Sequence, residues 1–477
     1  MAVSDYAPWS SDRSLATRSS VERSIEQTVG RRVQAPGLVQ KLLERPAIRY
    51  NALLLAANVA IGAANFLLHP VLKRLLGVSA YGTFASLLAV QTILLIPVGI
   101  LVVLVARYAS TYSAQQRLDR LNDLLRRLTW VFLPAGLIVA LLLALASAPL
   151  SSFFQLQSSQ VLLILALSFV VAFASQVNLG AVQGLQRFGW FAVLSAMPAV
   201  SRLLFGAVLV LLGLGVDGAV WGLTLAAVCQ YAASFQPLRG VLGGRRAASE
   251  PFRSMIALSS TTTLALACLT LLFNLDTVLA KHYLDGRDAG LYAAVAVLGK
   301  TSLFVTGSVV TVMFPRVTAL HARGERTARV ALQSVAAVAV LAGIAELAFA
   351  AVPATIMRLL FGSDTVAVSG QLAWYGLAML FLALSQALSY YFVSIGSRRY
   401  ALALYVCCPL MALLIVAHHQ SVAEIVQAVV AANGLLCVTL IGFFLRAARL
   451  ENRAHSPAHH DTSPPEQAHA DVAEPSV

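Results

Sequence analysis

The chain has 477 residues, of which 58% are hydrophobic and only 12% are charged, and its mean hydropathy is +0.78. A soluble domain is typically about 45–50% apolar and about 25% charged, so this composition excludes a soluble globular domain and fits lipid as the solvent. The net charge of +13 indicates basic loops beside anionic phospholipid rather than a nucleic-acid partner.

The predicted organisation follows the alternation of polar and apolar sequence. Residues 1–47 are polar and hold no early apolar stretch of the kind that begins a cleavable signal peptide. We expect them to be a cytoplasmic, largely disordered extension. A first lobe at 48–237, a cytoplasmic loop at 238–254, a second lobe at 255–446 and a disordered cytoplasmic tail at 447–477 complete the predicted chain.

The apolar stretches predict an all-α polytopic membrane protein. A membrane-spanning helix needs about 20 mostly apolar residues. By this criterion the chain has about twelve spans, six in each lobe. They cover residues 50–72, 83–106, 129–148, 160–182, 190–213, 217–237, 255–280, 291–314, 331–353, 370–395, 401–417 and 422–446.

The segment between the second and third spans is amphipathic. Leu118, Leu121, Leu125 and Leu128 recur at helical spacing among arginines. This pattern is typical of a helix that lies along a membrane surface, so we predict that the segment rests on the inner leaflet.

The distribution of positive charge predicts the orientation. An even number of spans puts both termini on one side, and 27 of the 34 Lys and Arg residues fall in the termini and loops of that side. The opposite loops hold five, which are Lys73, Arg74, Lys281, Arg287 and Arg358. Because positively charged loops stay in the cytoplasm, we expect both termini there.

The two predicted lobes resemble each other. An offset of 208 residues aligns Lys73 with Lys281, Gly82 with Gly290 and Phe84 with Tyr292, at the ends of equivalent helices. Six is an even number, so both halves have the same topology and should be related by an axis along the membrane normal. Transporters of this kind bind substrate between their halves, so we expect a central cavity and alternating access.

Two positive charges lie inside predicted spans, Arg202 in the fifth and Lys300 in the eighth. Charge is costly in lipid, so such residues face a cavity or a partner. One interpretation is a cationic cavity that binds an anionic headgroup. The alternative is that each residue pairs with a buried carboxylate or carbonyl group.

Neutral polar residues form stripes on two spans that the repeat relates. Asn51, Asn58 and Asn65 share one face of the first span, and Thr270 and Asn274 share a face of the seventh. These faces are candidates for opposing cavity walls. Interhelical hydrogen bonding is the alternative.

Two acidic residues in the second lobe are candidates for ion coupling. Asp276 lies off the polar stripe of its span, where it could pair with Lys281 or carry a proton, and Glu346 lies in the ninth span. The five cysteines form no CxxC pair and indicate neither a disulfide framework nor a metal site. There is no Walker A motif, so we expect no nucleotide, no other cofactor and no enzyme activity.

Several loose motifs at span ends resemble those of a known family. The motifs are Leu72–Gly77 followed by Tyr81-Gly82, Arg107-Tyr108, Gln183–Phe188, Gly290–Ala293 and Phe314-Pro315. With these motifs the chain resembles, over roughly residues 48–446, the Wzx-type polysaccharide-biosynthesis flippases of the multidrug/oligosaccharidyl-lipid/polysaccharide (MOP) exporter superfamily.

The resemblance implies a MATE-like fold of two six-helix lobes around a central cavity. It also implies transport of undecaprenyl-pyrophosphate-linked oligosaccharide across the bacterial inner membrane, for exopolysaccharide, capsule or O-antigen synthesis, beside a polysaccharide polymerase and chain-length machinery. Lys300 would then suit the pyrophosphate, and Asn51, Asn58, Asn65 and Gln91 could hydrogen-bond sugar hydroxyls.

Two other functions fit the same hydropathy. A cation-coupled multidrug exporter of the same superfamily would prefer acidic residues in its cavity, whereas the central charges here are basic. A membrane polysaccharide polymerase or ligase usually carries a large external loop, and the outer loops predicted here are short.

Overall fold

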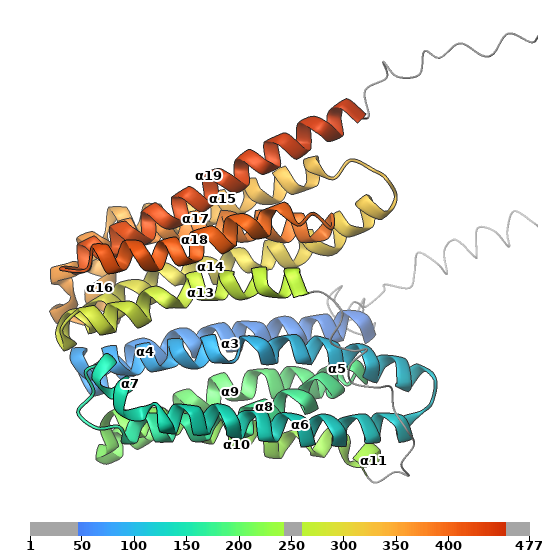
Figure 1. Cartoon of the computed structure of the whole chain (residues 1–477), viewed down its shortest axis with the longest axis horizontal. Coiled ribbons are helices and arrows are strands. Elements are labelled where there is room, and N and C mark those ends of the chain that lie inside the picture. The colour runs from blue at the N-terminus through green and yellow to red at the C-terminus, as the bar shows by residue number, and fades with distance from the viewer. Residues whose placement is uncertain (1–45, 243–259, 455–477) are drawn as a thin grey trace, which may run out of the picture. The chain divides into compact units, whose positions relative to one another are not determined.

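The computed structural model describes residues 46–242 and 260–454 (Figure 1). The predicted disorder of the N-terminal extension and of the end of the tail falls on residues outside these ranges, apart from the tail segment 447–454 discussed below.

The first half of the described chain is a series of helices that follow one another closely. They are α3 (Pro46–Leu76), α4 (Val78–Leu94), α5 (Ile96–Ala114), α6 (Leu118–Leu145), α7 (Ser147–Phe153), α8 (Gln160–Gly184), α9 (Phe188–Leu209), a π-helical turn (Val210–Leu214), α10 (Gly215–Ser234), a 3-10 turn (Gln236–Leu238) and α11 (Arg239–Leu242).

The second half repeats this order. Its elements are α13 (Ser260–Tyr283), α14 (Gly286–Ala322), α15 (Ala328–Ala351), α16 (Pro353–Phe361), the 3-10 helix η3 (Ser363–Val368), α17 (Gly370–Ser394), α18 (Arg399–Ala417) and α19 (Val422–Ala454). In each half a short helix follows the third membrane-spanning helix: α7 follows α6, and α16 follows α15 (Figure 1). The predicted all-α architecture of two repeat-related halves is confirmed.

Ten stretches of the described residues are long and apolar enough to cross a membrane. One of them, Phe188–Leu242, contains both α9 and α10, which the sequence predicts as two spans. The predicted span at 83–106 is divided between α4 and α5 at Leu95, because Pro97 at the start of α5 has no N–H to continue the hydrogen-bond ladder of α4.

The predicted surface helix before the third span is wrong. Leu118 to Leu145 form one continuous helix, α6. Leu121, Leu125 and Leu128 are fully or almost fully buried and pack against residues of α5 and α8 rather than against lipid. The leucine stripe marks a helix–helix contact, and helical periodicity alone does not distinguish the two environments.

One helix of each half lies at the centre of its neighbours. In the first half α8 packs against α5, α6, α9 and α10, and in the second half α17 packs against α14, α15 and α19. Polar residues of α8 are satisfied inside the first half, where Ser175 donates to Gln230 at 3.1 Å and Asn178 donates to Ser234 at 2.8 Å. Such hydrogen bonds hold helices together where no water is available.

The halves touch where α4 crosses α13 and α14. The backbones meet at two glycines that the sequence repeat aligns. A Cβ atom on Gly82 would lie 2.7 Å from the amide nitrogen of Gly290, and one on Gly290 would overlap the carbonyl oxygen of Val78. Only a glycine fits at either position, so this crossing fixes the closest approach of the two halves.

Further contacts join the halves at the end where α3 and α13 terminate, which we call the closed end. Lys73 at the end of α3 ion-pairs with Asp364 and donates to the carbonyl oxygen of Phe361. Arg74 donates to the carbonyl oxygen of Leu359 at 2.5 Å. Lys73 and Arg74 break the predicted charge asymmetry because they bind the α16–η3 segment of the other half.

The segment predicted as the start of a disordered tail is helical. α19 continues to Ala454. Glu451, near its end, accepts hydrogen bonds from the backbone N–H groups of Thr327 at 2.5 Å and Ala328 at 2.9 Å. These are orphan donors at the start of α15, so the end of α19 caps another helix and is ordered by that contact.

Candidate functional site

A cavity of about 370 Å³ lies where the two halves face each other, and we call it the central cavity. Two neighbouring cavities of about 290 and 450 Å³ share Thr92 with it. The polar lining comes from both halves, and it consists of Asn65, His69, Thr92 and Arg202 from the first and Asn274, Thr277, Lys300 and Thr301 from the second.

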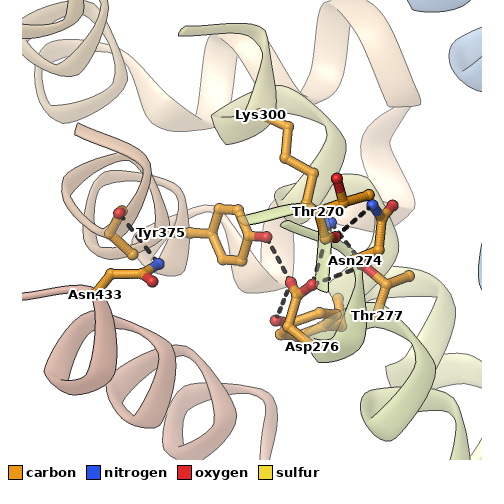
Figure 2. Close-up of polar contacts among 9 residues, drawn as sticks. Thr270, Asn274, Asp276, Thr277, Lys300, Tyr375 and Asn433 are labelled. Carbon is orange, nitrogen blue, oxygen red and sulfur yellow. Dashed lines mark hydrogen bonds and ion pairs between the residues drawn. The ribbon is translucent and has the colours of Figure 1, made fainter. Parts of the chain in front are cut away.

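Lys300 on α14 is held in a buried network (Figure 2). Its Nζ donates to Asp276 Oδ1 at 3.2 Å and to Thr277 Oγ1 at 2.9 Å. The hydroxyls of Tyr292 and Tyr375 both donate to Asp276 Oδ2, at 2.8 and 2.5 Å. Asp276 is fully buried, and this set of donors satisfies both of its oxygens.

The network compensates the charge of Lys300 within the second half. Of the partners considered from the sequence, the carboxylate of Asp276 pairs with Lys300 rather than with Lys281. Lys300 still lines the central cavity, and its nitrogen lies 5.0 Å from the centroid of the Phe273 ring. A cation over an aromatic face gains further stabilisation in a low-dielectric site.

Arg202 on α9 faces the same cavity in different surroundings. Its Nη2 donates to Asn65 Oδ1, and its Nε is buried without a hydrogen-bond partner. Within residues 46–242 and 260–454 it forms no ion pair. Arg202 therefore presents a positive charge to the central cavity that no protein group neutralises.

The other predicted cavity residues are placed unevenly. Asn274 lines the central cavity and donates to the carbonyl oxygen of Thr270, which lines both neighbouring cavities. Gln91 lines the 450 Å³ cavity but donates to Ser168 of α8 at 3.0 Å.

One asparagine of the predicted stripe is not brought into this arrangement. Asn58 is exposed on α3, about two turns before Asn65. The side chain of Asn51 is outside the described residues.

Glu346 lies on the α15 face that packs against α17. Its Oε2 is buried without a hydrogen-bond partner and lies directly against Gly376, beside Tyr375. A bulkier residue at Gly376 would collide with this oxygen. Glu346 is thus a half-buried carboxyl group, with one buried oxygen and no cation bound to it in the described part of the chain.

Tyr292 and Tyr375 belong to the buried network of the candidate site, and the sequence does not single them out. A fully buried aspartate requires several donors, and tyrosines within apolar spans are suitable ones. Tyr375 is 99 residues from Asp276 in the chain, so only the packing of α17 against α14 and α13 identifies it.

The fold is shared with known transporters. A multidrug resistance MATE family transporter of the MOP superfamily, in an inward-facing conformation, superposes with a TM-score of 0.61 at 13% identity, over 84% of this chain and 96% of that one. The lipid II flippase MurJ, in an inward closed conformation, gives a TM-score of 0.62 at 14% identity, over 85% and 90%. The Vibrio cholerae MATE transporter VcmN gives 0.55 at 14%, over 85% and 96%. No curated protein sequence matches the chain.

These likenesses show that the chain has the fold of MATE transporters, and its ten apolar stretches make it a multi-pass membrane protein. The family model for polysaccharide biosynthesis proteins matches residues 49–321, which is more than half of the chain. The chain belongs to this polysaccharide biosynthesis protein family, so the family predicted from the sequence motifs is confirmed.

Proposed function

We propose that this protein moves an undecaprenyl-pyrophosphate-linked oligosaccharide from the inner to the outer leaflet of the bacterial inner membrane by alternating access, with both termini in the cytoplasm. The observation that carries the proposal is Arg202, an unpaired cation that faces a cavity lined by both halves. A pyrophosphate would supply the missing counter-charge, and the guanidinium fork suits two phosphate oxygens.

The rest of the cavity supports the same substrate. Asn65, Asn274 and Thr277 offer donors and acceptors for sugar hydroxyls beside the cationic end. Membership of the polysaccharide biosynthesis family favours a glycan cargo. A polysaccharide polymerase and chain-length machinery would then act on the delivered units.

A multidrug exporter of the same superfamily is the second candidate, supported by the likeness to MATE transporters. The lining of the central cavity favours the first. It includes Arg202 and Lys300 but no Asp or Glu residue. A cationic drug would meet uncompensated positive charge there, which opposes its binding.

Reconstituted vesicles that carry a fluorescent pyrophosphate-linked glycolipid test the proposal. We expect Arg202→Gln to lower the translocation rate by about ten-fold or more, because it removes a charge-assisted contact of about 1.5–3 kcal/mol. Arg202→Lys keeps the charge but not the fork, so it should retain part of the rate.

The matched control is Arg287→Gln, which removes an exposed charge from the closed end and should leave translocation unchanged. Normal translocation by Arg202→Gln, at a normal amount of inserted protein, would contradict the proposal. Export of a cationic dye with no glycolipid movement would favour the multidrug exporter instead.

A further inference from the structure

A second polar cavity, of about 600 Å³, lies at the closed end, and we call it the end pocket. The first half contributes the α3–α4 turn with Ser79, the α7–α8 loop with Gln157 and Ser158, and Asp217 at the start of α10. The second half contributes Lys281 and Gly286. The end pocket shares no lining residue with the central cavity.

The sequence repeat shows what is unusual about Lys281. Its equivalent, Lys73, ion-pairs with Asp364 and donates to the carbonyl oxygen of Phe361. The offset of 208 residues that relates the two lysines also relates Phe361 to Phe153 and Asp364 to Leu156. The surroundings of Lys281 thus have an apolar leucine where those of Lys73 have the carboxylate of Asp364.

The backbone acceptor that could bind Lys281, equivalent to the carbonyl oxygen of Phe361, is already occupied. The carbonyl oxygen of Phe153 is bound by His282 Nδ1 at 2.8 Å, and the His282 ring stacks on Phe153 with centroids 3.9 Å apart. Gln155 donates to the carbonyl oxygen of His282 at 2.9 Å. This hydrogen bond joins the two halves here, whereas Lys73 joins them at the equivalent position. Lys281 therefore does not take part in the contact between the halves.

Lys281 is therefore a nearly buried cation, 3% exposed, that lines the end pocket. Over the described residues it makes neither a hydrogen bond nor an ion pair. Asp217 lines the same pocket without pairing with it, and the exposed Asp285 caps α14 by accepting from the N–H of Asp288. Asp285 attracts this cation without contacting it, so the ammonium group of Lys281 is free to bind an anion in the end pocket.

We propose that the end pocket is a second anion site, which binds a phosphate group that carries neighbouring hydroxyls. Lys281 binds the phosphate, while the carboxylate of Asp217 and the side chains of Ser79, Gln157 and Ser158 bind the hydroxyls. A sugar phosphate and the headgroup of phosphatidylglycerol both have this chemistry. The site does not depend on the function proposed for the central cavity.

A labelling experiment on the full chain in phosphatidylcholine nanodiscs tests the site. Ala80→Cys places a thiol on the lining of the end pocket without removing a proposed contact, and the rate of its reaction with a polar maleimide is measured with and without glucose 1-phosphate. The parent chain gives the background from the five native cysteines. We expect glucose 1-phosphate to slow the reaction and glucose, which lacks the phosphate, to have little effect.

Two variants and a control then test the role of Lys281. Lys281→Gln should weaken the apparent affinity about ten-fold or more, because a charge-assisted hydrogen bond is lost. Leu156→Asp should do the same, because it supplies the carboxylate that Asp364 supplies to Lys73. Arg287→Gln removes an exposed charge nearby and should leave the affinity unchanged.

Nanodiscs that contain phosphatidylglycerol separate the two sources of the ligand. Slow labelling in them without added sugar phosphate, relieved by Lys281→Gln, would support the site and identify the lipid headgroup as its occupant. The proposal is overturned if neither glucose 1-phosphate nor phosphatidylglycerol slows the labelling reaction, or if the slowing persists in Lys281→Gln. Binding at the central cavity is measured separately with the Arg202 variants, so failure of one proposal does not imply failure of the other.

Discussion

The two cations of the central cavity, Lys300 and Arg202, lie in opposite halves of the molecule, and they differ in whether a carboxylate neutralises their charge. Lys300 is neutralised by Asp276, which two tyrosines also bind. Arg202 has Asn65 as its hydrogen-bond acceptor and a buried Nε with no partner. A charge within the membrane is thus a structural feature where a carboxylate accompanies it and a candidate binding site where none does.

The largest effect should come from breaking the ion pair between Lys300 and Asp276. Asp276→Asn removes the counter-charge of Lys300 and replaces one of two acceptor oxygens with an NH2 group, so that either Lys300 or both tyrosines lose their acceptor. Removal of one partner of a buried ion pair costs about 3–5 kcal/mol, so we expect the amount of inserted protein to fall sharply. The measurement is thermal unfolding in detergent together with the membrane protein level.

The exposed Glu325→Gln is the control and should have little effect, because Glu325 and Arg323 are both largely solvent-exposed. The double variant Asp276→Asn with Lys300→Gln should recover part of the stability, since no charge is then left unpaired. A stable, normally abundant Asp276→Asn protein would show that the network does not hold the second half together.

A second test gives the unpaired Arg202 a carboxylate partner, as Lys300 already has. Asn65→Asp gives Arg202 a carboxylate in the place of its amide partner. We expect protein levels to be kept and translocation of the pyrophosphate-linked glycolipid to fall about ten-fold or more, because the charge is no longer available to the ligand.

Asn65→Ala is the matched comparison, since it removes the same hydrogen bond without adding charge, and it should lose less activity than Asn65→Asp. Equal activity of Asn65→Asp and the parent protein would mean that the free charge of Arg202 is not what binds the substrate.

The smallest effect on stability is expected at Glu346, the carboxyl group of the second half that has no cation beside it. Glu346→Gln keeps the shape of the side chain and removes the ionisable group, so we expect the free energy of unfolding to change by about 0.5 kcal/mol or less. We propose that Glu346 carries the coupling proton, so translocation by Glu346→Gln should lose its response to an imposed proton gradient. An unchanged response would assign the coupling elsewhere.

Most of the fold follows from hydropathy, because each span must bury its backbone polar groups in its own helix. The division of α4 from α5 is harder to predict, since Pro97 lies among prolines that do not break their helices, such as Pro134 in α6. The helical character of residues 447–454 depends on a contact between Glu451 and the start of α15, 124 residues away.

The sequence predicts the candidate site only in part, for a related reason. Helical periodicity correctly separates Asp276 from the polar stripe that Asn274 shares with Thr270. It does not identify the partner of Asp276, because Lys281 is close along the helix whereas Lys300 is brought near by the turn between α13 and α14. The contact of Arg202 with Asn65 joins residues 137 apart, which no local pattern reveals.

The length of α14 has a mechanical consequence. Its 37 residues extend about 55 Å, well beyond the roughly 30 Å of a bilayer's hydrocarbon core. The glycine crossing at Gly290 lies close to one end of this rod, about 48 Å from Ala322 at the other. A tilt of about 10° around that crossing would move the far end by roughly 8 Å, so a rotation too small to disturb the packing near the pivot could open a passage at the opposite face of the membrane.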